Sequence, residues 1–260
     1  MTRLFFLSGL PRSGSTLLAS IMNQHPQIYV SGTSPLMDLL CLTDQNIGTL
    51  RKQYSFSTTQ EFRIHDGLLN SFYAHVEKPI VFDKHRGWPR NAPNLSRYIK
   101  NPRIVCTIRP VAEVITSYII LVLRNPHENF VDDRLKQKKL SLTIENRAKL
   151  LWEEYIQDPY QSTLAGLQTN RENMLLVSYA DIVSKPDHVL HSICEFIGCD
   201  ANIKYDFFDI RNTNPEKDVE GWGMPGLHTV RPMLKSISKH PEDVIGPLLT
   251  SYFEQFDLVP

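Results

Sequence analysis

The stretch that decides the fold is Arg3-Leu4-Phe5-Phe6-Leu7-Ser8-Gly9-Leu10-Pro11-Arg12-Ser13-Gly14-Ser15-Thr16. Its apolar run, residues 3–8, predicts a short strand buried on both faces, and the glycine that follows ends it. Residues 9–16 are rich in Gly, Pro and hydroxyl side chains, which predicts a loop. A helix is predicted from Thr16, because the next apolar residues fall on one face: Leu17, Leu18, Ile21 and Met22.

The loop at residues 9–16 has the spacing of a phosphate-binding loop. Its two glycines allow successive backbone N–H groups to point at an anion, and the helix adds its positive N-terminal end. Ser15 stands where the nucleotide-triphosphatase motif has Lys, so the cation of this loop is Arg12. A guanidinium binds two oxygens of a phosphate or sulfonate at once. A Gly-Ser turn without function is the alternative, and the strand–loop–helix context weakens it.

The rest of the chain alternates between short apolar runs and helical patterns. Strands are predicted at 79–82, 103–108 and 173–177. Helices are predicted at 34–42, 59–76, 93–100, 110–124, 141–168, 186–197 and about 241–256. Residues 125–140 are polar without a clear period, which predicts an exposed loop or lid, and residues 206–232 are expected to be irregular. This order predicts an α/β fold, a P-loop-containing parallel sheet flanked by helices on both faces, in a single domain spanning 1–260.

Composition narrows the classes of function. The chain has 28 basic and 28 acidic side chains and a formal net charge of zero, which argues against binding nucleic acid or a membrane surface through a positive field. No segment approaches the roughly 20 apolar residues that span a bilayer, and the run at 4–10 is too short for a signal peptide. Cys41, Cys106, Cys194 and Cys199 are too scattered for a disulfide scaffold or a zinc knuckle. We therefore expect reduced thiols and no metal in a cytoplasmic protein.

The loop sequence resembles that of a known family. Residues 11–16 are similar to the 5′-phosphosulfate loop, P-[RK]-[ST]-G-[ST]-[TS], of the sulfotransferases that use PAPS (3′-phosphoadenosine 5′-phosphosulfate). Leu17-Leu18 and His25-Pro26 resemble the tyrosylprotein-sulfotransferase branch in particular. The resemblance implies a sulfotransferase-like fold with PAPS as the sulfonate donor. It also implies that the 5′-phosphosulfate is bound by Arg12, Ser13, Gly14, Ser15 and Thr16.

A second family signature is an Arg at a strand end followed eight positions later by a Ser on the next helix; here these are Arg109 and Ser117. The resemblance implies that both bind the 3′-phosphate of the nucleotide. The residues themselves support this, because Arg109 leaves the carboxyl end of a buried strand, where open α/β sheets bind ligands. For either residue alone, a structural role is the alternative. The Asp that the family has four residues after the Arg is Glu113 here.

Three further residues match in chain order. Residues 175–182 resemble the family segment L-x-x-x-Y-E-D-L, in which the Tyr, here Tyr179, contacts the adenine. Lys84 lies 25 residues before Arg109 and matches the Lys that bridges to the transferring sulfonate. A Lys at this place suits the charge that builds on the bridging oxygen. Arg231, within His228-Thr229-Val230-Arg231-Pro232, is expected to be a basic residue of a late loop over the cofactor.

The general base is not assigned by the resemblance. Cytosolic family members have a His two residues after the Lys, where this chain has Arg86, and the Glu of the tyrosylprotein branch has no counterpart after His25-Pro26. His85 is the first candidate, because an imidazole titrates near neutral pH. Asp38 and Asp83 are the alternatives, and Asp83 has a second possible role in orienting Lys84.

The sequence thus predicts an enzyme that transfers the sulfonate of PAPS to a hydroxyl or amine acceptor, with Arg12, Lys84 and His85 as its catalytic residues. The acceptor is not identified, because its pocket is expected to be built from residues 31–75, 125–140 and 206–232. A P-loop kinase or nucleotide triphosphatase is an alternative, since residues 80–83 resemble a strand that ends in a metal-binding Asp. A catalytically inactive nucleotide-binding module is another.

Overall fold

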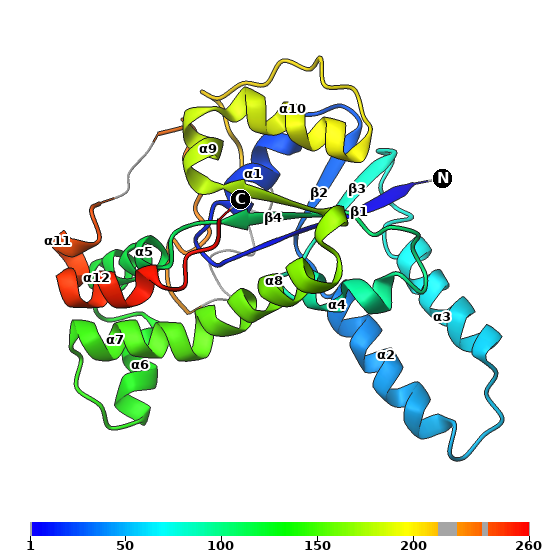
Figure 1. Ribbon diagram of the computed structural model, residues 1–260, viewed down its shortest axis with the longest axis horizontal. Helices are drawn as coiled ribbons and strands as arrows, with labels where there is room; N and C mark the ends of the chain where they lie inside the picture. Colours follow the sequence, from blue (N-terminus) through cyan, green and yellow to red (C-terminus); the bar gives the residue numbers. More distant parts are fainter. Residues whose placement is uncertain (1, 213–222, 236–238, 260) are drawn as a thin grey trace.

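A computed structural model describes residues 2–212, 223–235 and 239–259. At its centre lies a five-stranded parallel sheet with the strand order β2-β3-β1-β4-β5 (Figure 1). The strands are β1 (Arg3–Gly9), β2 (Ile28–Thr33), β3 (Ile80–Lys84), β4 (Ile104–Ile108) and β5 (Met174–Ser178). The predicted α/β fold with a parallel sheet is confirmed.

β2 is a strand that the sequence analysis did not predict. It lies at the edge of the sheet and pairs with β3 in regular register only from Ile28 to Val30, with a shift before Thr33. The apolar run that could have predicted β2 is equally short. It consists of Ile28-Tyr29-Val30, an apolar run of β-branched and aromatic residues close behind Pro26.

The register of the strands places the carboxyl ends at one edge of the sheet. Leu7 of β1 lies opposite Lys84, the last residue of β3, and Gly9 lies opposite Thr107 of β4. A Cβ on Gly9 would lie 2.1 Å from Thr107 Oγ1, so only glycine permits this approach of the two strands. The loop after β1, Lys84, Arg109 after β4 and Tyr179 after β5 therefore emerge side by side, where parallel sheets bind ligands.

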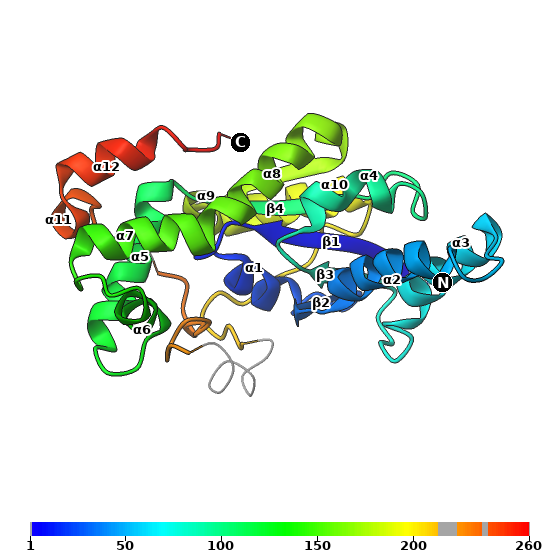
Figure 2. The same cartoon turned by 90° about the horizontal axis from the view of Figure 1, so that it is seen from below.

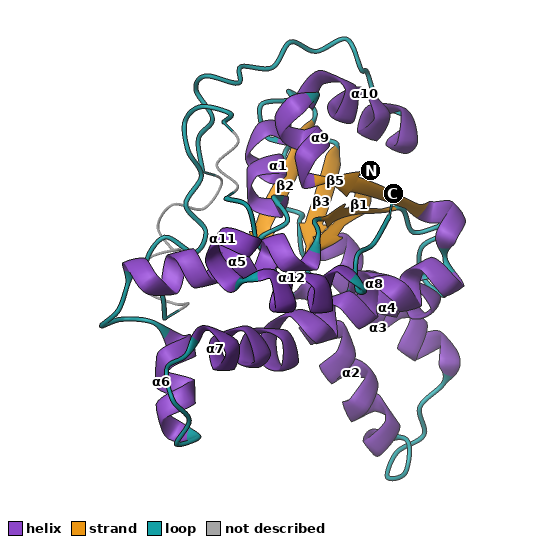
Figure 3. Cartoon of the chain, turned by 60° about the vertical axis from the view of Figure 1, so that its left-hand side comes forward, coloured by secondary structure: helices purple, strands orange, loops and turns teal. Residues whose placement is uncertain are grey.

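Helices cover both faces of the sheet (Figures 2 and 3). Their bounds are α1 (Ser15–Met22), α2 (Leu36–Leu50), α3 (Thr58–Ser71), α4 (Trp88–Leu95), α5 (Val111–Arg124), α6 (Phe130–Gln137), α7 (Ile144–Leu151), α8 (Gln157–Thr169), α9 (Tyr179–Ser184), α10 (Pro186–Ile197), α11 (Glu242–Ile245) and α12 (Pro247–Glu254). A π-helical stretch, Trp152–Ile156, joins α7 to α8, and a 3₁₀ turn, Arg171–Asn173, precedes β5. The single final helix predicted at 241–256 is wrong, because Gly246 (φ 81°) separates α11 from α12.

The prediction that residues 125–140 form a loop or lid is also wrong, because they contain α6. The side chain of Asn129 accepts a hydrogen bond from Asp132 N and caps this helix. Val131 and Leu135 are buried on one face, and Asp132 pairs with Arg147 of α7 at 2.7 Å. An apolar stripe of so few residues, within a strongly charged segment, does not produce a clear helical period in the sequence.

The core follows the alternation of side chains along the strands. Phe5 and Leu7 of β1 pack with α1 and α10 on one face, whereas Phe6 packs with Trp88 of α4 on the other. Burying a side chain of this size contributes about 1.5–3 kcal/mol. A third apolar cluster joins α5, α6, α7 and α12. None of the helices in the described part of the chain is long and apolar enough to cross a membrane.

Helices α2 and α3 form an antiparallel pair, which we call the arm (residues 36–71). The arm lies at one end of the long axis of the molecule, and α6, α7, α11 and α12 lie at the other end (Figures 1 and 2). Within α2, Leu36, Leu40 and Ile47 are buried at helical spacing. The arm therefore packs along one stripe, while apolar side chains outside that stripe are exposed, including Leu42 and Phe62.

Candidate functional site

A cavity of about 550 Å³ lies between the loop after β1, α5 and residues 227–235. Most of the site residues predicted from the sequence line it: Arg12, Gly14, Ser15, Thr16, Arg109, Ser117, Tyr179 and Arg231. These residues come from distant parts of the chain, and the strand order brings them to one edge of the sheet.

The loop at 9–16 is held in an unusual backbone conformation. Gly14, at the N-terminus of α1, has φ 91°, and a Cβ there would lie 2.8 Å from the ring of Tyr179. Arg12 has φ 60°, a region that non-glycine residues enter at a cost. Arg109 supports this conformation by donating from Nη1 to Arg12 O at 3.1 Å. The loop is thus shaped by the same residues that line the cavity.

Arg12 connects three elements around the cavity. Its Nε donates to Ser117 Oγ of α5 at 3.2 Å, and its Nη1 donates to the carbonyl of Leu227. Burial, and the nearby charges of Arg109 and Arg86, lower the pKa of Arg12. None of the ion pairs among the described residues includes Arg12. An anion bound here would supply the compensating charge that this buried cation lacks.

Arg109 and Tyr179 form the second part of the cavity. Arg109 directly follows β4, and its guanidinium carbon lies 4.3 Å from the ring centroid of Tyr179, the first residue of α9. Its Nε pairs with Glu113 at 3.0 Å, one turn along α5. The Arg109 side chain is only 8% exposed, so these contacts fix its direction. Stacking and an ion pair together preorganise a cation next to an aromatic face.

Lys84 meets the loop from the neighbouring strand. As the last residue of β3, it donates from Nζ to Thr16 Oγ1 at 2.8 Å, while its backbone N donates to Ser31 Oγ. Its ammonium therefore lies at the point where the loop becomes α1. The sequence assigned Arg12 and Lys84 to the same transferring group. Arg12 lines the cavity, whereas Lys84 is not among the lining residues and contacts the loop through Thr16, which is.

Ser13 does not face the cavity. Its side chain is completely buried, and its hydroxyl bonds Leu10 O and Thr107 Oγ1 at 2.5 and 2.6 Å. The side chain of Ser13 thus ties the loop to β4. The Ser13 side chain is therefore not available to the cofactor. The backbone N–H of Ser13 also has a partner, because it donates to Leu10 O at 3.3 Å.

His85, the first candidate for the base, lies outside the residues that line the cavity. Its Nδ1 accepts a hydrogen bond from Gly87 N at 3.0 Å, and its Nε2 lies 3.6 Å from Asp38 Oδ2 on α2. With Nδ1 accepting, the ring proton sits on Nε2 and faces Asp38. Burial lowers the pKa of His85, with Arg86 acting in the same direction and Asp38 opposing it. In this arrangement neither ring nitrogen presents a lone pair to a substrate.

Asp83 is committed to the core. Its two carboxylate oxygens accept from Tyr73 OH at 2.5 Å and from Trp88 Nε1 at 2.7 Å, and the residue is completely buried. Burial raises the pKa of Asp83, although the hydrogen bonds oppose this. Because these contacts point it away from Lys84, its side chain holds the end of β3 against α4 and Tyr73. Asp38 is exposed on α2, beside His85.

The cavity also contains residues that the sequence analysis did not assign to it. Arg86, Arg124, Lys235 and Lys239 add positive charge, and among the described lining residues there is no Asp or Glu. His228 is the one histidine among the lining residues that the structure describes. The sequence signal for His228 was its place three residues before Arg231, in the segment already expected to form a late loop.

A cluster of metal-ligand type lies outside this cavity. The donor atoms of His25, Cys194 and Cys199 are all within 4.8 Å of one another. His25 Nδ1 accepts from Gln27 N at 3.0 Å, and its Nε2 lies 3.1 Å from Asp200 O. Burial and the Cys194 thiol raise the pKa of Cys199 to about 12. In this structure both ring nitrogens of His25 are engaged by the backbone of Gln27 and Asp200.

Solved structures of low sequence identity resemble the chain. A sulfotransferase from Alicyclobacillus acidocaldarius is 15% identical, with 79% of this chain and 84% of that chain covered and a TM-score of 0.49. The sulfotransferase domain from the curacin biosynthetic pathway is 19% identical, with coverages of 100% and 93% and a TM-score of 0.49. A mouse sulfotransferase complexed with PAP is 14% identical, with coverages of 76% and 59% and a TM-score of 0.45.

No curated protein matches the sequence. The tyrosylprotein branch stays a prediction, because no similarity distinguishes that branch from the rest of the family. The family itself is identified by its sequence model, described as "Sulfotransferase family", which matches residues 5–202. This match covers the sheet, the loop after β1, Lys84, Arg109 and Tyr179, and the chain therefore belongs to the sulfotransferase family.

Proposed function

We propose that the chain transfers the sulfonate group of PAPS to a hydroxyl or amine acceptor. The observation that carries this proposal is the pairing of two cationic sites in one cavity. Arg12 lines the cavity at the loop after β1, where Lys84, which is not among the lining residues, donates to Thr16 Oγ1, and Arg109 stacks on Tyr179 at 4.3 Å. A nucleotide with a phosphosulfate at its 5′ end and a phosphate at its 3′ position carries negative charge at both places.

At the 5′ end, the phosphosulfate is proposed to bind at the N-terminus of α1, with backbone N–H groups of the loop as donors. Arg12 is proposed to bind sulfonate or phosphate oxygens through its fork of donors. Lys84 is proposed to donate to the bridging oxygen, on which charge develops as the bond to sulfur breaks. Its bond to Thr16 Oγ1 at 2.8 Å holds the ammonium ready for that contact.

At the other end, Arg109 and Ser117 are proposed to bind the 3′-phosphate and Tyr179 the adenine. Arg109 is prealigned by Glu113 and Arg12 O, so little side-chain entropy is lost when the phosphate binds. Ser117 already accepts a hydrogen bond from Arg12 Nε. We propose that Arg231, on the lining segment after His228, closes over the nucleotide.

The kinase alternative would need a carboxylate that holds Mg²⁺ beside the phosphates. The residue that suggested it, Asp83, has both oxygens bonded to Tyr73 and Trp88 and does not line the cavity. This position disfavours a kinase or triphosphatase. Turnover that stops when Mg²⁺ is chelated would favour the alternative.

The proposal is tested by binding and by turnover. We expect adenosine 3′,5′-bisphosphate to bind much more tightly than AMP or ATP and to raise the melting temperature. Incubation with sulfur-labelled PAPS and a set of phenols, alcohols and amines is expected to label an acceptor and to release the bisphosphate. Equal affinity for nucleotides with and without a 3′-phosphate would overturn the proposed donor. Tight binding of the bisphosphate without labelling of any acceptor would favour an inactive nucleotide-binding module.

A further inference from the structure

The proposed transfer needs a group that takes a proton from the acceptor, and the cavity lining restricts the choice. Guanidinium and ammonium groups have no lone pair to offer, and phenols and hydroxyls are protonated donors at neutral pH. Among the described residues that line the cavity, none is an Asp or Glu, and the one imidazole belongs to His228. A neutral imidazole is a proton acceptor over the physiological pH range.

Two side chains hold the backbone at His228. The carbonyl of the preceding residue, Leu227, accepts a hydrogen bond from Arg12 Nη1. The carbonyl of His228 itself accepts from Asn212 Nδ2 at 3.2 Å. The imidazole is half-buried in a lining that also contains Thr16 and Arg86. It thus lies on the segment tied to the same arginine that is proposed to hold the sulfonate.

We infer that His228 is the catalytic base of the proposed transfer, the role that the sequence analysis gave first to His85. This inference rests on the proposed function. As the acceptor oxygen or nitrogen forms its bond to sulfur, its proton passes to a ring nitrogen of His228. The bond between sulfur and the bridging oxygen breaks, and its electron pair stays on the 5′-phosphate of the bisphosphate product. His85 does not fit this role, because its Nδ1 accepts from Gly87 N and its Nε2 faces Asp38.

The cations around His228 make the pKa of its imidazole depend on whether the nucleotide is bound. Burial and the charges of Lys84, Arg86 and Arg12 lower the pKa of His228 to about 3. Among the described residues that line the cavity, the charged side chains besides Arg12 and Arg86 are also cations: Arg109, Arg124, Arg231, Lys235 and Lys239. The negative charges of PAPS would offset these cations and raise the pKa of His228 toward its ordinary range. The imidazole is therefore a weak base in the empty site and a stronger one when the donor is bound.

The test compares His228→Gln and His228→Ala with two other variants, using sulfur-labelled PAPS and the acceptor that the unmutated protein labels best. We expect both His228 variants to lose turnover by about 10²–10⁴, the usual contribution of a general base. Their affinity for adenosine 3′,5′-bisphosphate should stay within a few-fold. His85→Ala tests the competing assignment and should keep most of the rate. His191→Gln, an exposed substitution on α10 outside the cavity, is the matched control.

A second readout follows the imidazole itself. In NMR titrations the ring protons of His228 should report a pKa far below 6 without ligand and a clearly higher pKa with adenosine 3′,5′-bisphosphate. A pKa that does not rise, or His228 variants that turn over at more than a tenth of the normal rate, would overturn the inference and leave the proposed function standing. Loss of bisphosphate binding in both His228 variants would also overturn it, because the residue would then serve binding. No transfer by an unmutated protein that binds the bisphosphate would overturn the inference together with the proposed function.

Discussion

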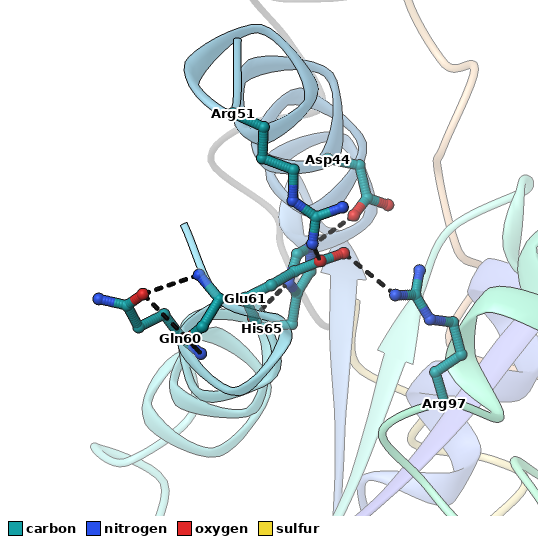
Figure 4. A network of polar contacts seen from close by, with 7 residues as sticks. Asp44, Arg51, Gln60, Glu61, His65 and Arg97 are labelled. Carbon is teal, nitrogen blue, oxygen red and sulfur yellow. Dashed lines mark hydrogen bonds and ion pairs between the residues drawn. The ribbon is translucent and has the colours of Figure 1, made fainter. Parts of the chain in front are cut away.

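The cavity and the arm both bury charged side chains, but they balance them differently. In the arm, the buried carboxylate of Glu61 accepts from Arg51 and from Arg97, the latter at 3.0 Å (Figure 4). His65 Nε2 lies 2.7 Å from Asp44, and the His65 ring stacks on Tyr98 with centroids 4.7 Å apart. In the cavity, many cations line one space, and the carboxylate paired with one of them is Glu113, on Arg109.

The two regions differ in how far their charges are paired within the fold. Taking a charge out of water is unfavourable unless an opposite charge or hydrogen bonds replace the water. The arm meets this requirement internally, so its network joins α2, α3 and Arg97 after α4 without needing a ligand. In the cavity, the partly buried Arg12 takes part in none of the ion pairs among the described residues, whereas the buried Arg109 is paired with Glu113. The other described cations of the lining are exposed to solvent: Arg86, Arg124, Arg231, Lys235 and Lys239. Positive charge next to a helix N-terminus favours an anionic ligand.

The largest effect that would sharpen this comparison is expected from Lys84→Ala. Removing a donor that acts only on the developing charge should lower kcat by about 10²–10³. Affinity for adenosine 3′,5′-bisphosphate should change by no more than a few-fold, because this product no longer carries the sulfonate whose transfer Lys84 is proposed to assist. Single-turnover kinetics with labelled PAPS measure the rate, and Lys149→Ala, exposed on α7, is the control. Undiminished turnover would remove Lys84 from the mechanism.

Next in size is the effect of Arg109→Ala on nucleotide binding. A hydrogen bond to a charged group contributes about 1.5–3 kcal/mol, so affinity for the bisphosphate should fall by about 10- to 100-fold. Affinity for AMP, which has no 3′-phosphate, should fall less, and only through the lost contacts of Arg109 with Arg12 O and Tyr179. Calorimetry with both nucleotides gives the comparison, with Arg134→Ala, outside the cavity, as the control. If Arg109→Ala still bound the bisphosphate more tightly than AMP to the same degree, another residue would have to bind the 3′-phosphate.

A smaller effect, confined to stability, is expected from Glu61→Gln in the arm. The substitution removes the charge that Arg51 and Arg97 share, but both arginines are about half exposed and water can replace the lost carboxylate. The expected cost is about 1 kcal/mol, seen as a fall of about 2–4 °C in the melting temperature. Bisphosphate affinity should not change. If Glu61→Gln weakened nucleotide binding instead, the charges of the arm and those of the cavity would not be independent of each other.

Stability is also expected to depend on pH. The pKa of His228 in the folded protein is lowered to about 3, whereas an unfolded chain has the ordinary value of about 6.5. As the pH falls below about 6.5, the unfolded state takes up a proton that the folded state does not, so stability declines toward about pH 3. His85, whose pKa is also lowered, adds to the same trend. Melting curves from pH 8 to pH 5 should show a shallower decline for His228→Gln; an identical slope would contradict the burial of a neutral imidazole.

Some features of this protein were predictable because they are local. The loop at 9–16 could be predicted, since its glycines and the start of the following helix are both encoded by residues adjacent in the sequence. Arg109 and Tyr179 were placed at the site because each directly follows a short buried strand, and carboxyl ends of parallel strands share one edge. Edge strand β2 and helix α6 were not predicted, because their apolar patterns span too few residues to show a clear period.

By itself, the sequence determined the parallel sheet, the glycine loop after β1 and the cations at the ends of β1, β3 and β4, because strand order and backbone direction carry them to one edge. Only the tertiary structure decided which way the remaining side chains point. It turned Ser13 into the core, engaged both ring nitrogens of His85, and brought His228 into the cavity through the bond from Arg12 to Leu227, 215 residues apart. Contacts over such separations depend on how packed elements meet, and no periodicity along the chain records them.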